Sequence, residues 1–172
     1  IGVGLVGSEM CIRDSFFHEW ISGQKSVFVV ALYHPINSEI NPLSLIEYLD
    51  TKNKTICLPM VLNKKQPLIF KPWRPGKKMV IGHYGISVPD NDQTLIPDLI
   101  ICPLLAYDSK GMRLGYGGGF YDRTIKYFRK NKQVKYIGLA FSGQKSYHDL
   151  PSEVHDVPLD AVLTETGMDY FQ

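Results

Sequence analysis

Short apolar runs separated by polar segments constrain the fold of this chain more than any other feature of its sequence. SVFVVALY at residues 26–33 and TICLPMV at residues 55–61 open the series. Further runs follow at residues 68–73, 99–103, 135–141 and 160–165. Their length and their content of β-branched and aliphatic residues are typical of strands. The first run and the run at 99–103 are continuous enough to predict strands buried inside a sheet.

Helical segments lie between these runs. One helix is predicted over residues 42–52, with Asn41 as its N-cap and Pro42 in its first turn. A second helix is predicted over residues 120–130, where apolar residues gather on one face. Strands that alternate with helices predict an α/β fold, with a layered open sheet, largely parallel, and helices on both faces. At 172 residues the chain is long enough for a single domain with one core.

Two segments stand outside this pattern. Residues 74–97 are rich in Pro, Gly, Asn and Asp, which predicts loops with short extended pieces. The opening segment IGVGLVGSEMCIRDS, residues 1–15, lacks the cationic start and long apolar core of a signal peptide, and shows no helical or strand period. We interpret residues 1–15 as a non-native leader, translated from adapter or cloning sequence, and residues 16–172 as the domain. Finding the segment encoded in frame at the native locus would overturn this interpretation.

The composition argues against several functional classes. A formal net charge of +2 is well short of that of a nucleic-acid-binding protein, although it is compatible with anionic small ligands. Cys11, Cys57 and Cys102 are too widely spaced for a zinc site, and their odd number argues against a disulfide framework. A reducing cytoplasm is therefore the expected compartment. No apolar run reaches about 18 residues, so no membrane span is predicted.

The stretch GMRLGYGGGFYD, residues 111–122, contains five glycines and ends in a predicted helix. Loops between a strand and a helix lie at the carboxyl edge of an open α/β sheet, where ligands bind. Free N–H groups at a helix start favour an anion, and glycines let the backbone approach a phosphate. Arg113 is suited to pair with phosphate oxygens, and Asp122 to bind magnesium beside them. The stretch has neither the P-loop nor the GxGxxG spacing, and the alternative is a surface turn in which Asp122 only complements the helix dipole.

The longer segment PLLAYDSKGMRLGYGGGFYDR resembles the signature of the 5-formyltetrahydrofolate cyclo-ligase (5,10-methenyltetrahydrofolate synthetase) family. Other parts of the chain agree with this family in order, over roughly residues 27–165. They are Glu39 after the strand ending at Tyr33, Leu58-Pro59, GLAF at 138–141 with Gln144 after it, Leu150-Pro151, and His155-Asp156.

The resemblance implies an activity and a set of site residues. Members of this family use ATP and magnesium to convert 5-formyltetrahydrofolate to 5,10-methenyltetrahydrofolate, with release of ADP and phosphate. The formyl oxygen is phosphorylated, and N10 of the folate then attacks the activated carbon. The implied catalytic residues are Arg113 and Tyr121, and the implied metal ligands are Asp122 and Asp156. The implied ATP-binding residues are Arg113, Leu114, Gly115, Tyr116, Gly117, Gly118, Gly119, Phe120 and Tyr121. The implied substrate-binding residues are His34, Glu39, Tyr116, Gly117, Gly118, Gly119 and Phe120.

The expected protein is a cytoplasmic monomer that binds a free or polyglutamylated folate, without nucleic acid or membrane. The sequence departs from the family at its N-terminus, because the family's basic N-terminal helix, which also reaches ATP, would lie before residue 1. Val88-Pro89 also stands where the family often has Glu-Pro. These departures leave an alternative open, namely a truncated, non-catalytic relative that binds folate or nucleotide.

Several single residues have two interpretations. Asp108 is expected to anchor its loop through hydrogen bonds to the backbone rather than to act in catalysis. Tyr84 and Trp73 are candidates to stack on a folate ring, with core packing favoured for Trp73. His148 and His155 are interpreted as structural or solvated. A basic cluster is interpreted as a solvated helix face, with a landing surface for polyglutamate as the alternative. It comprises Lys126, Arg129, Lys130, Lys132 and Lys135.

Overall fold

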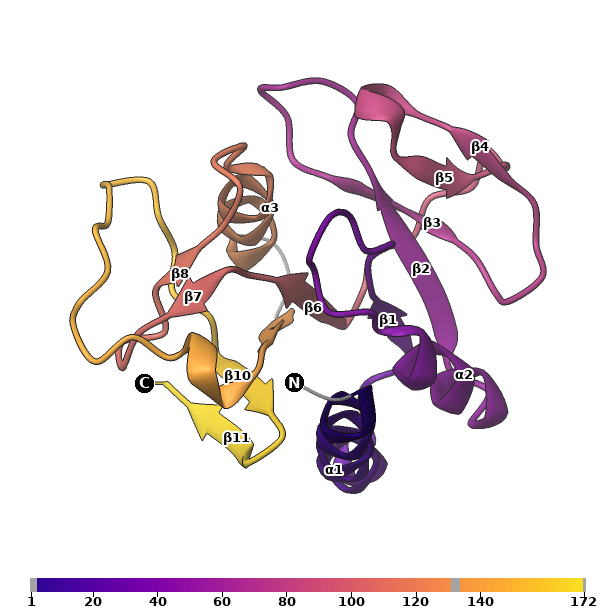
Figure 1. Cartoon of the computed structure of the whole chain (residues 1–172). Coiled ribbons are helices and arrows are strands. Elements are labelled where there is room, and N and C mark those ends of the chain that lie inside the picture. Colours follow the sequence, from indigo (N-terminus) through magenta and orange to yellow (C-terminus); the bar gives the residue numbers. More distant parts are fainter. Residues whose placement is uncertain (1–2, 131–133, 172) are drawn as a thin grey trace.

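A computed structural model describes residues 3–130 and 134–171, with the side chains of the first helix described from residue 13 onward. Among these residues a central sheet has seven strands in the order β11-β10-β9-β6-β1-β2-β3 (Figure 1). The five inner strands are parallel, and the two edge strands run antiparallel to their neighbours. The inner strands are β1 (Val29–Ala31), β2 (Thr55–Met60), β6 (Leu99–Pro103), β9 (Lys135–Leu139) and β10 (Ala161–Thr164). The edge strands are β3 (Ile69–Pro72) and β11 (Gly167–Tyr170).

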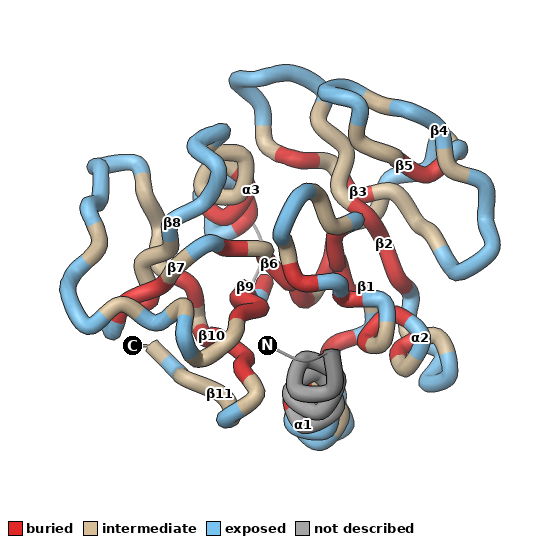
Figure 2. The backbone as a smooth tube through the Cα atoms, viewed as in Figure 1, coloured by how far each residue is buried: buried red, intermediate tan, exposed pale blue. Residues whose placement is uncertain are grey.

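Helices cover both faces of this sheet, so the predicted α/β architecture is confirmed. The helices α1 (Val3–Gly23) and α2 (Leu43–Thr51) lie on one face, and α3 (Phe120–Arg129) lies on the other (Figure 1). Successive residues of a strand point to opposite faces. Val30 and Leu32 accordingly join the core cluster of α1 and α2, whereas Ala31 joins the cluster of α3. The strands at the centre of the molecule are buried, and the exposed residues lie in the connecting loops and on the outer faces of helices (Figure 2).

Two small antiparallel hairpins and two short 3-10 helices complete the described chain. The hairpin of β4 (Met79–Ile81) and β5 (Ser87–Pro89) encloses η1 (His83–Gly85), and it lies in the segment for which loops with short extended pieces were predicted. The hairpin of β7 (Ala106–Tyr107) and β8 (Arg113–Leu114) leads from β6 into the glycine stretch. The helix η2 (Ser142–Gln144) follows β9.

The structure differs from the sequence predictions at the two ends of the chain. Residues 3–23 form one helix, although residues 1–15 show no period. Its described side chains contact the core through a short stripe, Phe17 and Ile21, because these residues lie one turn apart. A strand, β11, follows the one that was expected to be last; it pairs with β10 through a tight turn at Gly167, whose φ is +130°.

The structure also places the start of α2 one residue later than predicted. Pro42 occupies the cap position rather than the first turn. Asn41 still contributes, because its Oδ1 accepts a hydrogen bond from the N–H of Leu43 at 3.0 Å. None of the described helices combines the length and the apolar character needed to cross a bilayer.

Candidate active site

The glycine stretch lies at the carboxyl edge of the sheet, as predicted. β6 ends at Pro103, and the chain passes through the β7–β8 hairpin into residues 115–119 and then into α3. β1, the neighbour of β6, ends at the same edge and is followed by the loop at residues 34–41. The two loops meet where the hydroxyl groups of Ser38 and Tyr116 lie 3.4 Å apart. Loops from adjacent parallel strands thus face one another, which is the usual position of a ligand site in such sheets.

Gly119 shows why this loop needs glycine. It is the N-cap of α3, in the left-handed conformation, with φ of +60°. A Cβ atom at this position would lie 2.8 Å from Nη1 of Arg123. Arg123 folds back over the loop, donates a hydrogen bond from Nη2 to the carbonyl of Gly118 at 2.8 Å, and stacks on the ring of Phe120 at 4.9 Å. The backbone N–H groups of the first turn of α3 and the Arg123 guanidinium therefore converge on the glycine loop.

Arg113 and Asp122 form a largely buried ion pair. Nη2 of Arg113 lies 2.9 Å from Oδ1 of Asp122, and their side chains are 5% and 21% exposed. Nη1 of Arg113 donates to the carbonyl of Val157 at 3.1 Å, and the N–H of Val157 donates to the same Oδ1 of Asp122 at 3.2 Å. Asp156 precedes Val157, and its Oδ2 accepts a hydrogen bond from the N–H of Glu153 at 2.8 Å. The two expected metal ligands are thus linked through one backbone unit.

These two carboxylates suit a magnesium ion that is shared with phosphate. Both described protein contacts of the Asp122 carboxylate go to Oδ1. Magnesium is usually bound by one or two carboxylates together with substrate phosphates, rather than by an all-protein cage. Among the described residues, no group of three or more His, Cys, Asp or Glu is placed to hold a metal ion.

Glu39 is half-buried and interacts electrostatically with two tyrosines, Tyr33 and Tyr121. Oε2 of Glu39 accepts a hydrogen bond from the N–H of Ile36 at 2.9 Å, and burial raises the pKa of this carboxyl. Burial also raises the pKa of the phenols of Tyr33 and Tyr121, and the charge of Glu39 adds to both shifts. Both phenols are therefore protonated at neutral pH and lie within electrostatic reach of Glu39. His34, the other expected substrate residue on this loop, is exposed at its start.

The β4–β5 hairpin supplies a further aromatic residue beside the glycine loop. The ring of Tyr84 lies 6.1 Å from that of Phe120, and Nζ of Lys64 lies 5.9 Å from the Tyr84 ring. Tyr84 has φ of +59°, an unusual conformation for a residue other than glycine. Tyr84, a candidate from the sequence to stack on a folate ring, thus lies beside Phe120.

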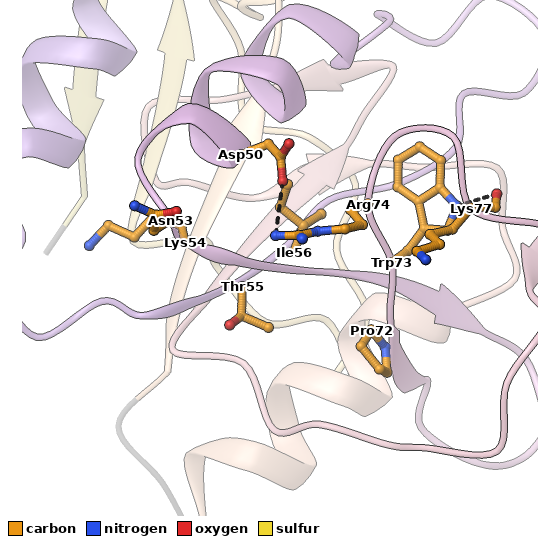
Figure 3. Close-up of a pocket in the computed structure, with 9 residues that line it drawn as sticks. All are labelled: Asp50, Asn53, Lys54, Thr55, Ile56, Pro72, Trp73, Arg74 and Lys77. Carbon is orange, nitrogen blue, oxygen red and sulfur yellow. Dashed lines mark hydrogen bonds and ion pairs between the residues drawn. The ribbon is translucent and has the colours of Figure 1, made fainter.

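Trp73 does not belong to this site. It packs against the α1–α2 core cluster, as favoured from the sequence, and lines a pocket of about 320 Å³ at the amino end of β2. Figure 3 shows this pocket, in which Arg74 reaches Asp50 in an ion pair of 3.4 Å. Because the inner strands are parallel, this pocket lies at the edge of the sheet opposite to the glycine loop.

Asp108 anchors its loop, as predicted. Its buried Oδ1 accepts hydrogen bonds from the N–H groups of Lys110 at 2.9 Å and Met112 at 3.0 Å, and its Oδ2 accepts one from Leu150 at 2.9 Å. One carboxylate therefore joins the hairpin that leads into the glycine loop to the segment before Asp156. His148 and His155 are exposed.

The residues of the predicted basic cluster make different contacts. Arg129 pairs with Asp160 at 3.0 Å, and Nζ of Lys135 bonds to Oε1 of Gln24. Lys126 and Lys130 are exposed, and Lys132 lies outside the described residues. Arg123 and Ser38 are site residues that were not predicted from the sequence. Arg123 could have been found, because it lies one turn after the last glycine of the loop; no local signal marks Ser38.

Comparisons with known proteins identify the family to which the sequence is similar. The sequence model of the 5-formyltetrahydrofolate cyclo-ligase family matches residues 16–165. The 5-formyltetrahydrofolate cyclo-ligase of Haemophilus influenzae is 38% identical over 146 residues, which are 81% of this chain and 77% of that protein. That of Mycolicibacterium smegmatis is 33% identical over 155 residues, which are 84% of this chain and 78% of that protein.

Solved structures give the same result at the level of the fold. A 5,10-methenyltetrahydrofolate synthetase from Mycoplasma pneumoniae superposes with a TM-score of 0.73 at 22% identity, covering 96% of this chain and 90% of that one. The synthetase of Aquifex aeolicus superposes with a TM-score of 0.68 at 29% identity, covering 93% and 83%. Since the family model spans most of the sequence and relatives above 30% identity cover more than two thirds of it, the chain belongs to the 5-formyltetrahydrofolate cyclo-ligase family.

Proposed function

We propose that this chain catalyses the ATP-dependent cyclisation of 5-formyltetrahydrofolate to 5,10-methenyltetrahydrofolate. The observation that supports this most is the juxtaposition at the carboxyl edge of the sheet. A glycine loop at the start of α3, the carboxylate of Asp122 and the half-buried Glu39 loop face one site. This juxtaposition offers backbone N–H groups for a phosphate beside polar and aromatic side chains for a flat ring, which is what a reaction between ATP and a folate requires.

The ATP-binding segment is proposed to be the glycine loop and the start of α3, residues 114–121. An amide oxygen is a weak nucleophile and a poor leaving group, so phosphorylation of the formyl oxygen makes the carbon electrophilic. Phosphoryl transfer depends mainly on positioning and charge neutralisation. The backbone N–H groups of the glycine loop and the start of α3 would supply both without reorganisation. Asp122 and Asp156 would hold magnesium, which when bound would supply positive charge to neutralise the phosphates.

The folate is proposed to lie between the Glu39 loop and the start of α3. Glu39 would accept hydrogen bonds from the polar edge of the pterin, with His34 at the rim. Phe120 and Tyr84 would contact the flat rings. Tyr121, whose phenol stays protonated, would donate a hydrogen bond within the site. In this arrangement N10 attacks the activated carbon and the N10–C bond forms. N10 then loses its proton to solvent, and the bond from this carbon to the phosphorylated oxygen breaks to release phosphate.

The direct test follows the ultraviolet absorbance of methenyltetrahydrofolate in a mixture of 5-formyltetrahydrofolate, ATP and magnesium. We expect the chain to produce this signal and Asp122→Ala to abolish it. Asp92→Ala, which removes an exposed acid outside the site, serves as the matched control and should retain the signal. Turnover that is unchanged in both Asp122→Ala and Arg113→Ala would refute the proposed site. Binding of both ligands without turnover would instead identify the non-catalytic relative.

A further inference from the structure

The guanidinium of Arg113 contacts other groups of the protein. The side chain is 5% exposed; one terminal nitrogen contacts Asp122 and the other contacts the carbonyl of Val157. An arginine that binds phosphate usually offers the two-nitrogen edge of its guanidinium to the ligand. In Arg113 the two terminal nitrogens are already engaged, at 2.9 and 3.1 Å.

These contacts connect three separate parts of the fold. Arg113 comes from β8, Asp122 from the first turn of α3, and Val157 from the segment before β10. The N–H of Val157 completes the arrangement with a hydrogen bond of 3.2 Å to the same Asp122 oxygen that Arg113 contacts. Both contacts thus hold Oδ1 of Asp122, while Val157 fixes the backbone next to Asp156.

We propose that Arg113 is a positioning residue, which holds Asp122 and the Asp156 segment in one arrangement for the divalent cation that enters with the nucleotide. This inference rests on the proposed function, because it takes the two aspartates as the metal ligands. Residues that orient metal ligands typically contribute 10–100-fold to metal affinity. Loss of Arg113 would also leave the Asp122 carboxylate without its ionic partner in a largely buried place.

Arg123 offers a matched comparison, because it is the other arginine beside the glycine loop. Its described contacts are a hydrogen bond to Gly118, a weak one to Gln66 at 3.5 Å, and the stacking on Phe120. It contacts no carboxylate among the described ion pairs. Its guanidinium is therefore the one placed to meet a phosphate over the loop, and its removal should weaken nucleotide binding with or without metal.

The experiment separates metal affinity from nucleotide affinity. Mn²⁺ serves as the probe, and free Mn²⁺ is counted by electron paramagnetic resonance in the presence of saturating ADP. ADP affinity is measured separately in EDTA by calorimetry. For Arg113→Gln we expect Mn²⁺ affinity to fall about tenfold or more, with ADP affinity in EDTA unchanged within about twofold. For Arg123→Gln we expect ADP affinity in EDTA to fall, with Mn²⁺ affinity unchanged within about twofold.

A second variant guards against misfolding. Arg113→Lys keeps the positive charge but replaces the two separate guanidinium nitrogens, which contact Asp122 and Val157, with a single ammonium. It should therefore keep the thermal midpoint closer to that of the parent and still weaken Mn²⁺ binding. Arg113→Gln in an Asp122→Asn background should cause no further loss of Mn²⁺ affinity, because the two residues act through one ligand.

The outcomes distinguish this inference from the proposed function. If Asp122→Asn leaves Mn²⁺ affinity unchanged, the proposed metal site and the inference are both wrong. If Asp122→Asn weakens Mn²⁺ binding but the two Arg113 variants do not, the inference alone is wrong. Loss of ADP affinity in EDTA by Arg113→Lys, with Mn²⁺ affinity retained, would identify Arg113 as a phosphate ligand and would also overturn the inference.

Discussion

Gly119 meets two constraints at once, one from its own backbone and one from a neighbouring side chain. Its φ of +60° disfavours any residue with a Cβ, and Arg123 lies over the position that a Cβ would take. Gly117 shares only the first constraint, since its φ is +84° but no atom lies within 4 Å of a Cβ built there. Gly115 has neither. These three glycines of the loop therefore differ in how strictly each position requires a residue without a Cβ.

We predict a graded response to alanine at these three positions. Gly117→Ala and Gly119→Ala should each lower the free energy of unfolding by about 1–2 kcal/mol, the cost of a left-handed non-glycine residue. Gly115→Ala should change it by less than about 0.5 kcal/mol. Gly119→Ala should in addition displace Arg123 and raise the KM for ATP more than Gly117→Ala does. Urea denaturation and steady-state kinetics measure both effects, and equal unfolding free energies for all three variants would contradict the argument.

Asp108 gives a second prediction at the scale of one residue. Its carboxylate accepts three backbone hydrogen bonds, so Asp108→Ala should lower the free energy of unfolding by about 3 kcal/mol, given about 1.5–3 kcal/mol for a hydrogen bond to a charged group. Asp149→Ala is the control, because Asp149 pairs with Lys110 on the surface, where both side chains are more than 60% exposed. Its loss should cost less than about 1 kcal/mol. Similar losses in the two variants would show that burial of Asp108 is not decisive.

At the scale of elements, hydrophobic composition predicted the inner strands and the helix after the glycine stretch. It failed where structure depends on partners far along the chain. The run at 26–33 predicts a longer strand than Val29–Ala31, because neighbours on both sides determine where pairing stops. β11 has no apolar run and forms because the edge of β10 lies next to it. The assignment of residues 1–15 as a non-native leader stays a prediction.

The sequence likewise predicts some parts of the candidate site and not others. The glycine loop, Asp122 and the anchoring role of Asp108 are local, and residue type and spacing are enough to predict them. The contact of Arg113 with Val157 joins residues 44 positions apart, and the contact of Ser38 with Tyr116 joins residues 78 apart. Such pairs follow from the topology of the sheet, which no local pattern encodes.

The contact between α1 and α2 predicts a dependence of stability on pH. The ring of His18 stacks on Tyr48 with centroids 3.5 Å apart, and burial lowers the pKa of His18. The unfolded chain therefore binds the proton more readily, so the stabilisation is complete above the unfolded pKa of about 6.5 and is lost as the pH falls through the lower folded value. Urea denaturation at pH 7.5, 6.5 and 5.5 should show a steeper fall in unfolding free energy for the parent than for His18→Phe. Parallel curves would contradict this reading.

At the scale of the whole molecule, the two edges of the parallel sheet carry different groups. The carboxyl edge brings together the glycine loop, the Glu39 loop and the Arg113–Asp122 pair. The amino edge carries the pocket at Trp73, away from these groups. Helices on both faces hold the strands in place, so that loops from β1 and β6 meet at a fixed distance. The fold thus accounts for how two ligands as different as ATP and a folate would be brought into contact.

The central claim is that ATP consumption and ring closure are one reaction in this chain. The measurement that tests it most directly is the ratio of ADP released to methenyltetrahydrofolate formed, followed in one sample by coupled ADP detection and by ultraviolet absorbance. The account predicts a ratio of about one, with neither product formed when ATP or 5-formyltetrahydrofolate is omitted. ADP release without methenyltetrahydrofolate, or ring closure without ATP, would contradict it.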